Sequence, residues 1–313
     1  MKRALVLVGL LLAGAAFAQQ PAQLARQAAG GHKGAQEELQ RLAEAGNVLA
    51  EHYMGQLYLS GKGVPRSDER AVEWFRRAAA KGDAASAHNL GVIHERSTGA
   101  LRDRGEALKW YRFAAERGFV RSQANLGHLL SQDKDPEARQ WIEKAAAQKE
   151  PRGLYLLAML HLQAGGQEQQ AAELLRQAAQ GKDRDAQYRL ALLYGTGGGV
   201  PRDERLAMQW LRRAAGQRQP EAQYLLAAAY ARGQYGLKRD DEEAARWLRR
   251  SARQGNVEAQ YALANAYAEG RGVPYDPNEA LGWILLAAQN NHPQASQALA
   301  RIRALLPQPA QKP

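Results

Sequence analysis

The chain has 313 residues, of which 45% are hydrophobic and 24% are charged, a composition typical of a folded globular protein. It contains no cysteine, which excludes disulfides, thiolate metal sites, thiol catalysis and lipid attachment through a cysteine. The net charge of +11 favours acidic partners or anionic surfaces. No zinc-finger spacing or aromatic RNA-binding motif supports nucleic acid as a partner.

Residues 1–18 have the pattern of a secretory signal peptide. Lys2 and Arg3 precede an apolar run, and a small-x-small cleavage site ends at Ala18. The run is shorter than the roughly 20 residues that span a bilayer, and no later stretch approaches that length. We therefore expect export to the periplasm, with no transmembrane segment left after cleavage.

Residues 19–47 predict N-terminal capping helices, with Leu39 and Leu42 on their apolar side. At the other end, residues 291–306 predict one C-terminal capping helix. Residues 307–313 contain mainly Pro, Gln and Ala, which indicates a disordered tail.

Between these ends, residues 48–290 repeat one short pattern seven times. Each copy contains a large residue followed by Gly or Ala, and a Trp or Leu further along. The seven large residues are Met54, Leu90, Leu126, Leu157, Leu190, Leu226 and Leu263. A period of this length predicts a stack of small units that share one continuous core.

The seventh copy shows what one unit is expected to be. Apolar residues recur every four positions from Ala259 to Tyr267 and share one helical face. Gly270 and Gly272 then end this helix, and a second helix is expected from about Asn278 to Ala288. Each copy is therefore a helix–turn–helix hairpin.

The pattern Ala-Gln-Tyr-x-Leu-Ala-x-x-Tyr, followed by Gly-x-Gly-Val, Ala-x-x-Trp and Ala-Ala, resembles the Sel-1-like repeat family, which is related to the tetratricopeptide repeats. The best copies are Ala186–Gly216, Ala259–Asn290 and Ala50–Gly82, and the resemblance covers residues 33–290. It implies an all-α, right-handed α/α superhelical solenoid. It also implies, for most members, a protein-binding adaptor, and it does not imply a catalytic site.

Departures from the pattern are the candidates for function. The third and fourth copies lack Gly-x-Gly-Val and have short loops at Ser131–Asp135 and Ala164–Gly166, which predict a notch unless they are harmless deletions. In the sixth copy Tyr235 and Leu237 lie near a loop tip. They either contact a partner or tuck under the neighbouring loop.

A second candidate is a variable stripe on the first helices, which helical periodicity turns away from the core columns. We expect it to line a concave groove that binds a partner. Its middle is unusually apolar, and the alternative is that curvature of the stack buries it. The groove residues are Tyr53, Asn89, Asn125, His128, Leu156, Met159, Arg189, Leu192 and Leu225.

The second helices carry recurrent basic residues that stacking would align into a basic ladder. Such a ladder would attract an acidic protein or a lipid head group. The alternative is a solvated outer face on which arginine stems cover the apolar layer. The ladder residues are Arg76, Arg112, Arg176, Arg212 and Arg249.

The sequence offers no motif for catalysis, a metal or a cofactor. His94 and His161 replace a repeat tyrosine, and His52 and His88 share another repeat position, so all four suit packing. No histidine pair has the spacing of a helical metal site, and the glycines of Gly195–Val200 lack the Lys-Ser/Thr of a phosphate loop.

The favoured function is a non-catalytic periplasmic adaptor or scaffold that binds another, acidic protein through the groove. The alternative is an immunity protein that neutralises a phospholipase-type toxic effector in the periplasm, as some proteins resembling this family do. A cell-wall or β-lactam hydrolase is less favoured, because the family members linked to that activity are rich in cysteine.

Overall fold

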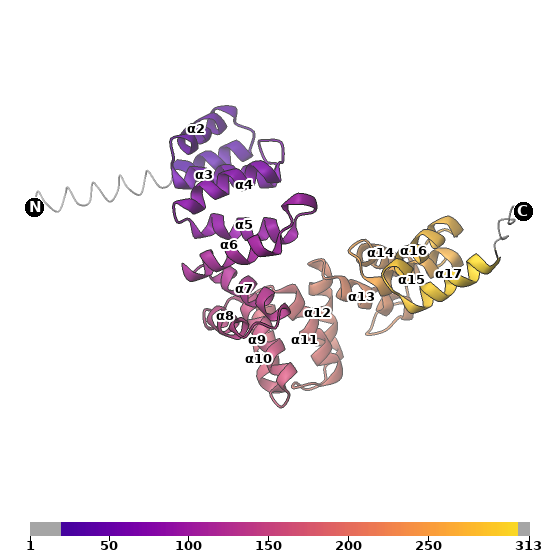
Figure 1. Ribbon diagram of the computed structural model, residues 1–313. Coiled ribbons are helices and arrows are strands. Elements are labelled where there is room, and N and C mark those ends of the chain that lie inside the picture. Colours follow the sequence, from indigo (N-terminus) through magenta and orange to yellow (C-terminus); the bar gives the residue numbers. More distant parts are fainter. Residues whose placement is uncertain (1–19, 306–313) are drawn as a thin grey trace, which may run out of the picture. The chain divides into compact units, whose positions relative to one another are not determined.

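The computed structural model describes residues 20–305, and all regular secondary structure in this range is helical (Figure 1). The predicted all-α solenoid class is confirmed. The predicted signal peptide and C-terminal tail lie outside the described residues. The chain divides into two compact units, Met1–Gly153 and Leu154–Pro313, with the boundary inside helix α9.

Seven repeats, numbered in chain order, each contain a first and a second helix. The first helices are α3 (Val48–Ser60), α5 (Ala84–Arg96), α7 (Val120–Gln132), α9 (Pro151–Ala164), α11 (Arg184–Thr196), α13 (Pro220–Arg232) and α15 (Val257–Glu269). The second helices are α4 (Asp68–Ala80), α6 (Arg104–Glu116), α8 (Glu137–Ala147), α10 (Glu168–Gln180), α12 (Glu204–Gly216), α14 (Asp241–Ala252) and α16 (Pro277–Gln289).

Helices flank the repeats at both ends. Residues 20–29 are helical and precede α2 (Lys33–Glu44), which packs on α3, while α17 (Pro293–Leu305) packs on α16. A short 3-10 turn, η1 (Gly99–Leu101), lies between α5 and α6. In the first unit α3 to α7 each pack on the next helix, and in the second unit α10 to α16 do the same.

Small residues set the spacing between the helices of a repeat. A Cβ added to Gly55 would lie 2.6 Å from the ring of Phe75, and one added to Gly91 would lie 2.6 Å from the ring of Tyr111. The large-then-small pairs therefore let an aromatic side chain of the second helix approach the backbone of the first helix.

A hydrogen-bonded amide pair with one buried member, which we call the glutamine clasp, joins successive repeats. Gln187 donates 3.0 Å to the carbonyl of Ala179 in the preceding repeat and accepts 2.7 Å from Gln217, which follows its own second helix. The same clasp recurs as Gln123 with Gln148, Gln223 with Gln254, and Gln260 with Asn290. In repeat 1 the two positions hold Glu51 and Lys81.

Candidate functional site

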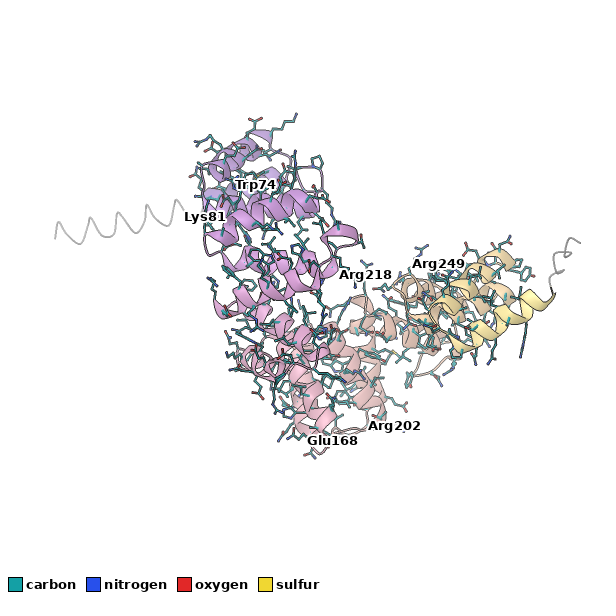
Figure 2. The ribbon with its side chains drawn as sticks, in the orientation of Figure 1. Trp74, Lys81, Glu168, Arg202, Arg218 and Arg249 are labelled. Atoms are coloured by element: carbon teal, nitrogen blue, oxygen red, sulfur yellow. The ribbon has the colours of Figure 1, made fainter. Side chains whose placement is uncertain are left out.

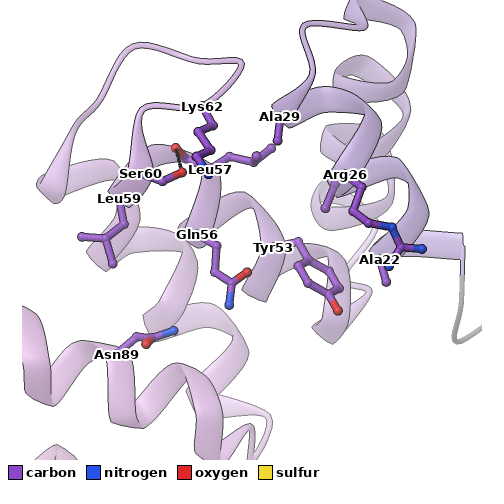
Figure 3. A pocket seen from close by; sticks show the side chains of 11 residues that line it. Ala22, Arg26, Ala29, Tyr53, Gln56, Leu57, Leu59, Ser60, Lys62 and Asn89 are labelled. Atoms are coloured by element: carbon purple, nitrogen blue, oxygen red, sulfur yellow. Dashed lines mark hydrogen bonds between the residues drawn. The ribbon is translucent and has the colours of Figure 1, made fainter. Parts of the chain in front are cut away.

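In the first unit, the predicted groove residues lie on three first helices. Asn125 and His128 lie half-buried on α7, while Tyr53 on α3 and Asn89 on α5 line a hollow of about 490 Å³. Figure 3 shows Ala22 and Arg26, from helical residues 20–29, across this hollow from the side chains of α3. The N-terminal capping helix therefore forms one wall of this hollow.

In the second unit, a pocket of about 310 Å³ brings together three residues predicted separately. Leu192 on α11 and Leu225 on α13 line it, and Tyr235 lies at its edge. Met208 and Leu211 of α12 are buried beneath it. We call this site the repeat 5–6 pocket.

The pocket exists because the loop after α13 departs from the repeat pattern. In repeats 5 and 7, the second glycine of Gly-x-Gly-Val packs so closely on the preceding second helix that a Cβ on Gly199 or Gly272 would clash with a backbone carbonyl there. Figure 2 labels Arg202 of the repeat 5 loop and Glu168 of α10 at the same edge of this unit.

The loop of repeat 6 does not make this contact. It has no Val-Pro, it reaches the N-cap of α14 one residue later than its counterparts, and a Cβ on Gly236 would meet nothing within 4 Å. Gly236 therefore does not make the close backbone contact that Gly199 and Gly272 make. Leu237 of this loop packs on the cluster that includes Leu211 of α12. Apolar side chains of α12 form the floor of the pocket.

The two loop residues predicted as contacts have different environments. Tyr235 is 49% exposed and has a left-handed backbone, with φ of 55°. Leu237 is half-buried and packs against the hydrophobic cluster that includes Leu211 and Leu226. Leu237 therefore fits the alternative in which its side chain tucks under the loop, and a partner contact by this residue stays a prediction.

The middle of the predicted groove needs a correction. Leu156 is only 7% exposed, so burial accounts for its apolar character and it offers no surface to a partner. Met159 is half-buried and Arg189 is exposed, and neither lines the repeat 5–6 pocket.

Arg232 supplies the charge at the pocket. It is exposed at the C-terminal end of α13, lines the pocket, and has no ion pair with any described residue. No acidic side chain lines the pocket. The site is thus an apolar hollow with one unpaired cation at its edge.

The basic ladder is largely neutralised by neighbouring side chains. Arg76 lies 3.7 Å from Glu106, Arg112 lies 2.7 Å from Glu137, and Arg176 pairs with Glu173. Arg249 donates 2.8 Å to the hydroxyl of Tyr267, and Arg212 is exposed. These partners come mostly from the next second helix or the same helix, so the ladder is not a row of free cations.

Other basic residues of the second helices cover tryptophans. The guanidinium groups of Arg77, Arg213 and Arg250 lie 4.4–4.5 Å from the ring centroids of Trp74, Trp210 and Trp247. Each arginine comes three residues after its tryptophan and so lies on the same side of the helix. These contacts fit the alternative in which basic side chains cover the apolar layer.

One cluster contains the residue types of a hydrolase triad. His52 Nδ1 lies 2.9 Å from Ser86 Oγ and 3.1 Å from Asp83 Oδ2. Both partners meet the same ring nitrogen and Ser86 is fully buried, so the histidine cannot relay a proton from an accessible serine. Burial opposes the charge of Asp83, but hydrogen bonds from His52 and Ser86 lower its pKa to about 2.

The same histidine–serine contact recurs one repeat later, which marks it as a packing contact between repeats. His88 Nδ1 lies 2.9 Å from Ser122 Oγ, and burial, helped by Arg121 and Arg96, lowers the pKa of His88 to about 4. No group of three or more metal-ligating side chains occurs within residues 20–305.

The stacked helical hairpins define a helical-repeat protein. The chain belongs to the Sel1 repeat family, whose model matches residues 48–83, 84–119, 120–150, 151–183, 184–218, 220–256 and 257–292. Proteins built from these repeats are generally non-catalytic protein-interaction modules.

Solved structures give the same assignment. A Sel1 repeat protein from Oxalobacter formigenes is 31% identical, with 90% of this chain and 85% of that chain covered and a TM-score of 0.59. The protein c5321, a protective antigen of uropathogenic Escherichia coli strains with an SLR fold, is 29% identical, with 92% and 68% covered and a TM-score of 0.51.

The immunity protein PA5088 from Pseudomonas aeruginosa is 18% identical, with 64% of this chain and 81% of that chain covered. Its TM-score of 0.49 is too low to support an argument about function. No curated protein matches the chain. Within residues 20–305, no helix has the length and apolar character needed to cross a membrane.

Proposed function

We propose that this protein is a non-catalytic periplasmic adaptor that binds another protein through the repeat 5–6 pocket. The observation that carries the proposal is the convergence of Leu192, Leu225 and Tyr235 on one hollow that the divergent loop leaves open. The periplasmic location rests on the signal pattern of residues 1–18.

The pocket suits a large apolar side chain of the partner. Its volume of about 310 Å³ falls at the small end of known binding pockets, so it has room for one anchoring side chain and its neighbouring backbone. Met208 at the floor is flexible and polarizable, which lets the floor adjust to the shape of the anchor.

The charge of the site favours an acidic group beside the anchor. Arg232 has no ion pair with a described residue, no acid lines the pocket, and the whole chain carries a net charge of +11. A carboxylate next to the anchor would pair with Arg232 as the pocket loses water. The proposed partner segment is therefore an apolar side chain flanked by an acidic residue or a C-terminal carboxylate.

Capture from a periplasmic extract tests this proposal when matched variants are compared. Leu192→Asp places a charge in the pocket, and Leu281→Asp places the same charge at an exposed leucine of α16. We expect the native protein and Leu281→Asp to capture the same protein and Leu192→Asp to lose it. Equal capture by all three would contradict the proposal.

The same experiment decides between an adaptor and an immunity protein. A pocket-dependent partner that is a component of the cell envelope supports the adaptor. A pocket-dependent partner that is a toxic enzyme, inhibited when this chain binds it, assigns the immunity role instead. Turnover of a β-lactam or a cell-wall fragment by the pure protein would contradict a non-catalytic function.

A further inference from the structure

The second unit contains another hollow, of about 430 Å³, whose lining residues are different from those of the repeat 5–6 pocket. Its walls come from the C-terminal ends of α12 and α14 and the start of α13, and three arginines line it: Arg218, Arg250 and Arg253. We call it the arginine hollow. Figure 2 shows Arg218 at the opposite edge from Arg202 and Glu168, so this hollow is separate from the loops that shape the repeat 5–6 pocket.

The positive charge of the arginine hollow is not balanced within the described residues. No acidic side chain lines it, and neither Arg218 nor Arg253 forms a side-chain ion pair in the described part of the chain. The acids nearest in sequence to Arg218 and Arg253 are engaged elsewhere, since Glu221 accepts a hydrogen bond from Gln219 and Glu258 lies 3.2 Å from His292 Nε2. Like charges that converge on one hollow attract a counter-anion.

One of the three arginines has an unfavourable backbone conformation. Arg218 has φ of 62°, in the left-handed region that disfavours side chains with a Cβ. At this point the turns after the other second helices hold Gly82, Gly118 and Gly255 in repeats 1, 2 and 6, Lys149 and Lys182 in repeats 3 and 4, and Asn291 in repeat 7. Other residue types adopt the same turn conformation, so the turn does not require an arginine. The backbone therefore gives no reason for the guanidinium group at position 218.

The other polar groups of the hollow help to define the ligand. The amides of Gln223 and Gln254 are used by the glutamine clasp, so the arginines are the available charged donors. Arg250 is held over the ring of Trp247 at 4.4 Å, and the buried Nε1 of Trp247 has no hydrogen-bond acceptor. The hollow thus presents the guanidinium donors of three arginines beside the apolar surface of Ala215 and Trp247.

We propose that the arginine hollow binds a phosphate or pyrophosphate group. Guanidinium groups pair with such oxyanions through two parallel hydrogen bonds, and several of them match a compact group with more than one negative charge. Three of the lining residues are arginines and none is acidic, so a ligand that brings negative charge fits the hollow. This site is independent of the proposed protein-binding pocket.

Calorimetric titration with inorganic pyrophosphate at low salt tests the site. The test variant combines Arg218→Gly with Arg253→Gln, because glycine suits the left-handed turn and leaves the fold intact. The control combines Arg202→Gln with Arg239→Gln, two exposed loop arginines that pair with Glu204 and Asp241. We expect binding to weaken tenfold or more in the test variant and to stay unchanged in the control.

Two further titrations identify the source of the group. Vesicles containing phosphatidylglycerol that bind the native protein, and that pyrophosphate displaces, identify a lipid head group. Pyrophosphate binding without vesicle binding identifies a free phosphate compound. Unchanged pyrophosphate affinity in the test variant, no pyrophosphate binding by the native protein, or Arg218-dependent binding of a polyglutamate peptide in preference to pyrophosphate would each overturn the proposal.

Discussion

Lys81 donates two hydrogen bonds of 2.8 Å to the fully buried carboxylate of Glu51, at the two positions where repeat 5 joins Gln217 to Gln187. Arg77 adds a third hydrogen bond to this carboxylate, at 3.0 Å. The first repeat therefore uses an ion pair where four later repeats use an amide pair.

Replacing both Glu51 and Lys81 by glutamine should restore the stability that replacing either residue alone removes. Glu51→Gln removes the carboxylate that Lys81 and Arg77 share, and Lys81→Gln leaves the buried carboxylate with Arg77 alone. Either change should lower the free energy of unfolding by about 2 kcal/mol. The double variant recreates the clasp of repeat 5 and should lie within about 1 kcal/mol of the native protein. Urea unfolding of all four proteins measures this, and purely additive losses would contradict it.

Enlarging a residue of the small column should destabilise the stack. Ala227 is buried next to Leu226 in α13, so Ala227→Leu overpacks the helix contact and should cost about 1–3 kcal/mol. The thermal midpoint of unfolding is the measurement. A midpoint equal to that of the native protein would show that these small residues do not set the helix spacing.

Filling the repeat 5–6 pocket should affect binding without destabilising the fold. Ala228 is half-buried and lines the pocket, so Ala228→Leu places its side chain in the hollow and not in a packed contact. We expect unchanged thermal stability and partner affinity weakened by about tenfold, equivalent to about 1.4 kcal/mol. Tight binding by this variant would place the partner elsewhere.

His88 should make the stability of the protein sensitive to mild acid. Burial lowers its pKa from 6.5 to about 4, so the unfolded chain takes up the proton first. Its contribution is fully present above pH 6.5 and is lost as the pH falls toward 4, by on the order of 2–3 kcal/mol. The pKa of Asp83 is also lowered, to about 2, but its contribution is lost only below pH 3.8.

His88→Tyr isolates this effect, because Tyr188 holds the equivalent position in repeat 5. Urea midpoints at pH 7 and pH 4.5 should differ less for the variant than for the native protein. An identical loss of stability in both proteins would assign the acid sensitivity to other groups.

The sequence period is sufficient to predict the hairpins, because the large-then-small pairs report directly on helix packing. Departures from the repeat pattern also predict contact residues, namely Leu192 and Leu225 from the variable stripe on the first helices and Tyr235 from the loop of the sixth copy. Their convergence on one pocket depends on the three-dimensional arrangement of α11, α13 and the repeat 6 loop, which a one-dimensional pattern does not contain.

The corrected predictions have specific physical causes. Helical periodicity alone places Leu156 on the groove, and it cannot tell an exposed stripe from one that neighbouring helices bury. The repeat pattern predicts the basic ladder without its partners, since Glu106 and Glu137 come from the next second helix.

Two features that the repeat pattern does not predict still leave a signal in the sequence. In repeats 3, 5, 6 and 7, a glutamine three residues before the large core residue accompanies Gln or Asn after the second helix, which is the glutamine clasp. Arg218 stands where several other turns have glycine, a substitution that points to the arginine hollow.

Photo-cross-linking in living cells tests the protein-binding account most directly. Tyr235, at the edge of the repeat 5–6 pocket, and Tyr275, which is 68% exposed in the loop of repeat 7, form a matched pair for replacement by a photoreactive phenylalanine. The account predicts a cross-linked partner protein from position 235 and none from position 275. No cross-link from position 235, or the same product from both positions, would contradict it.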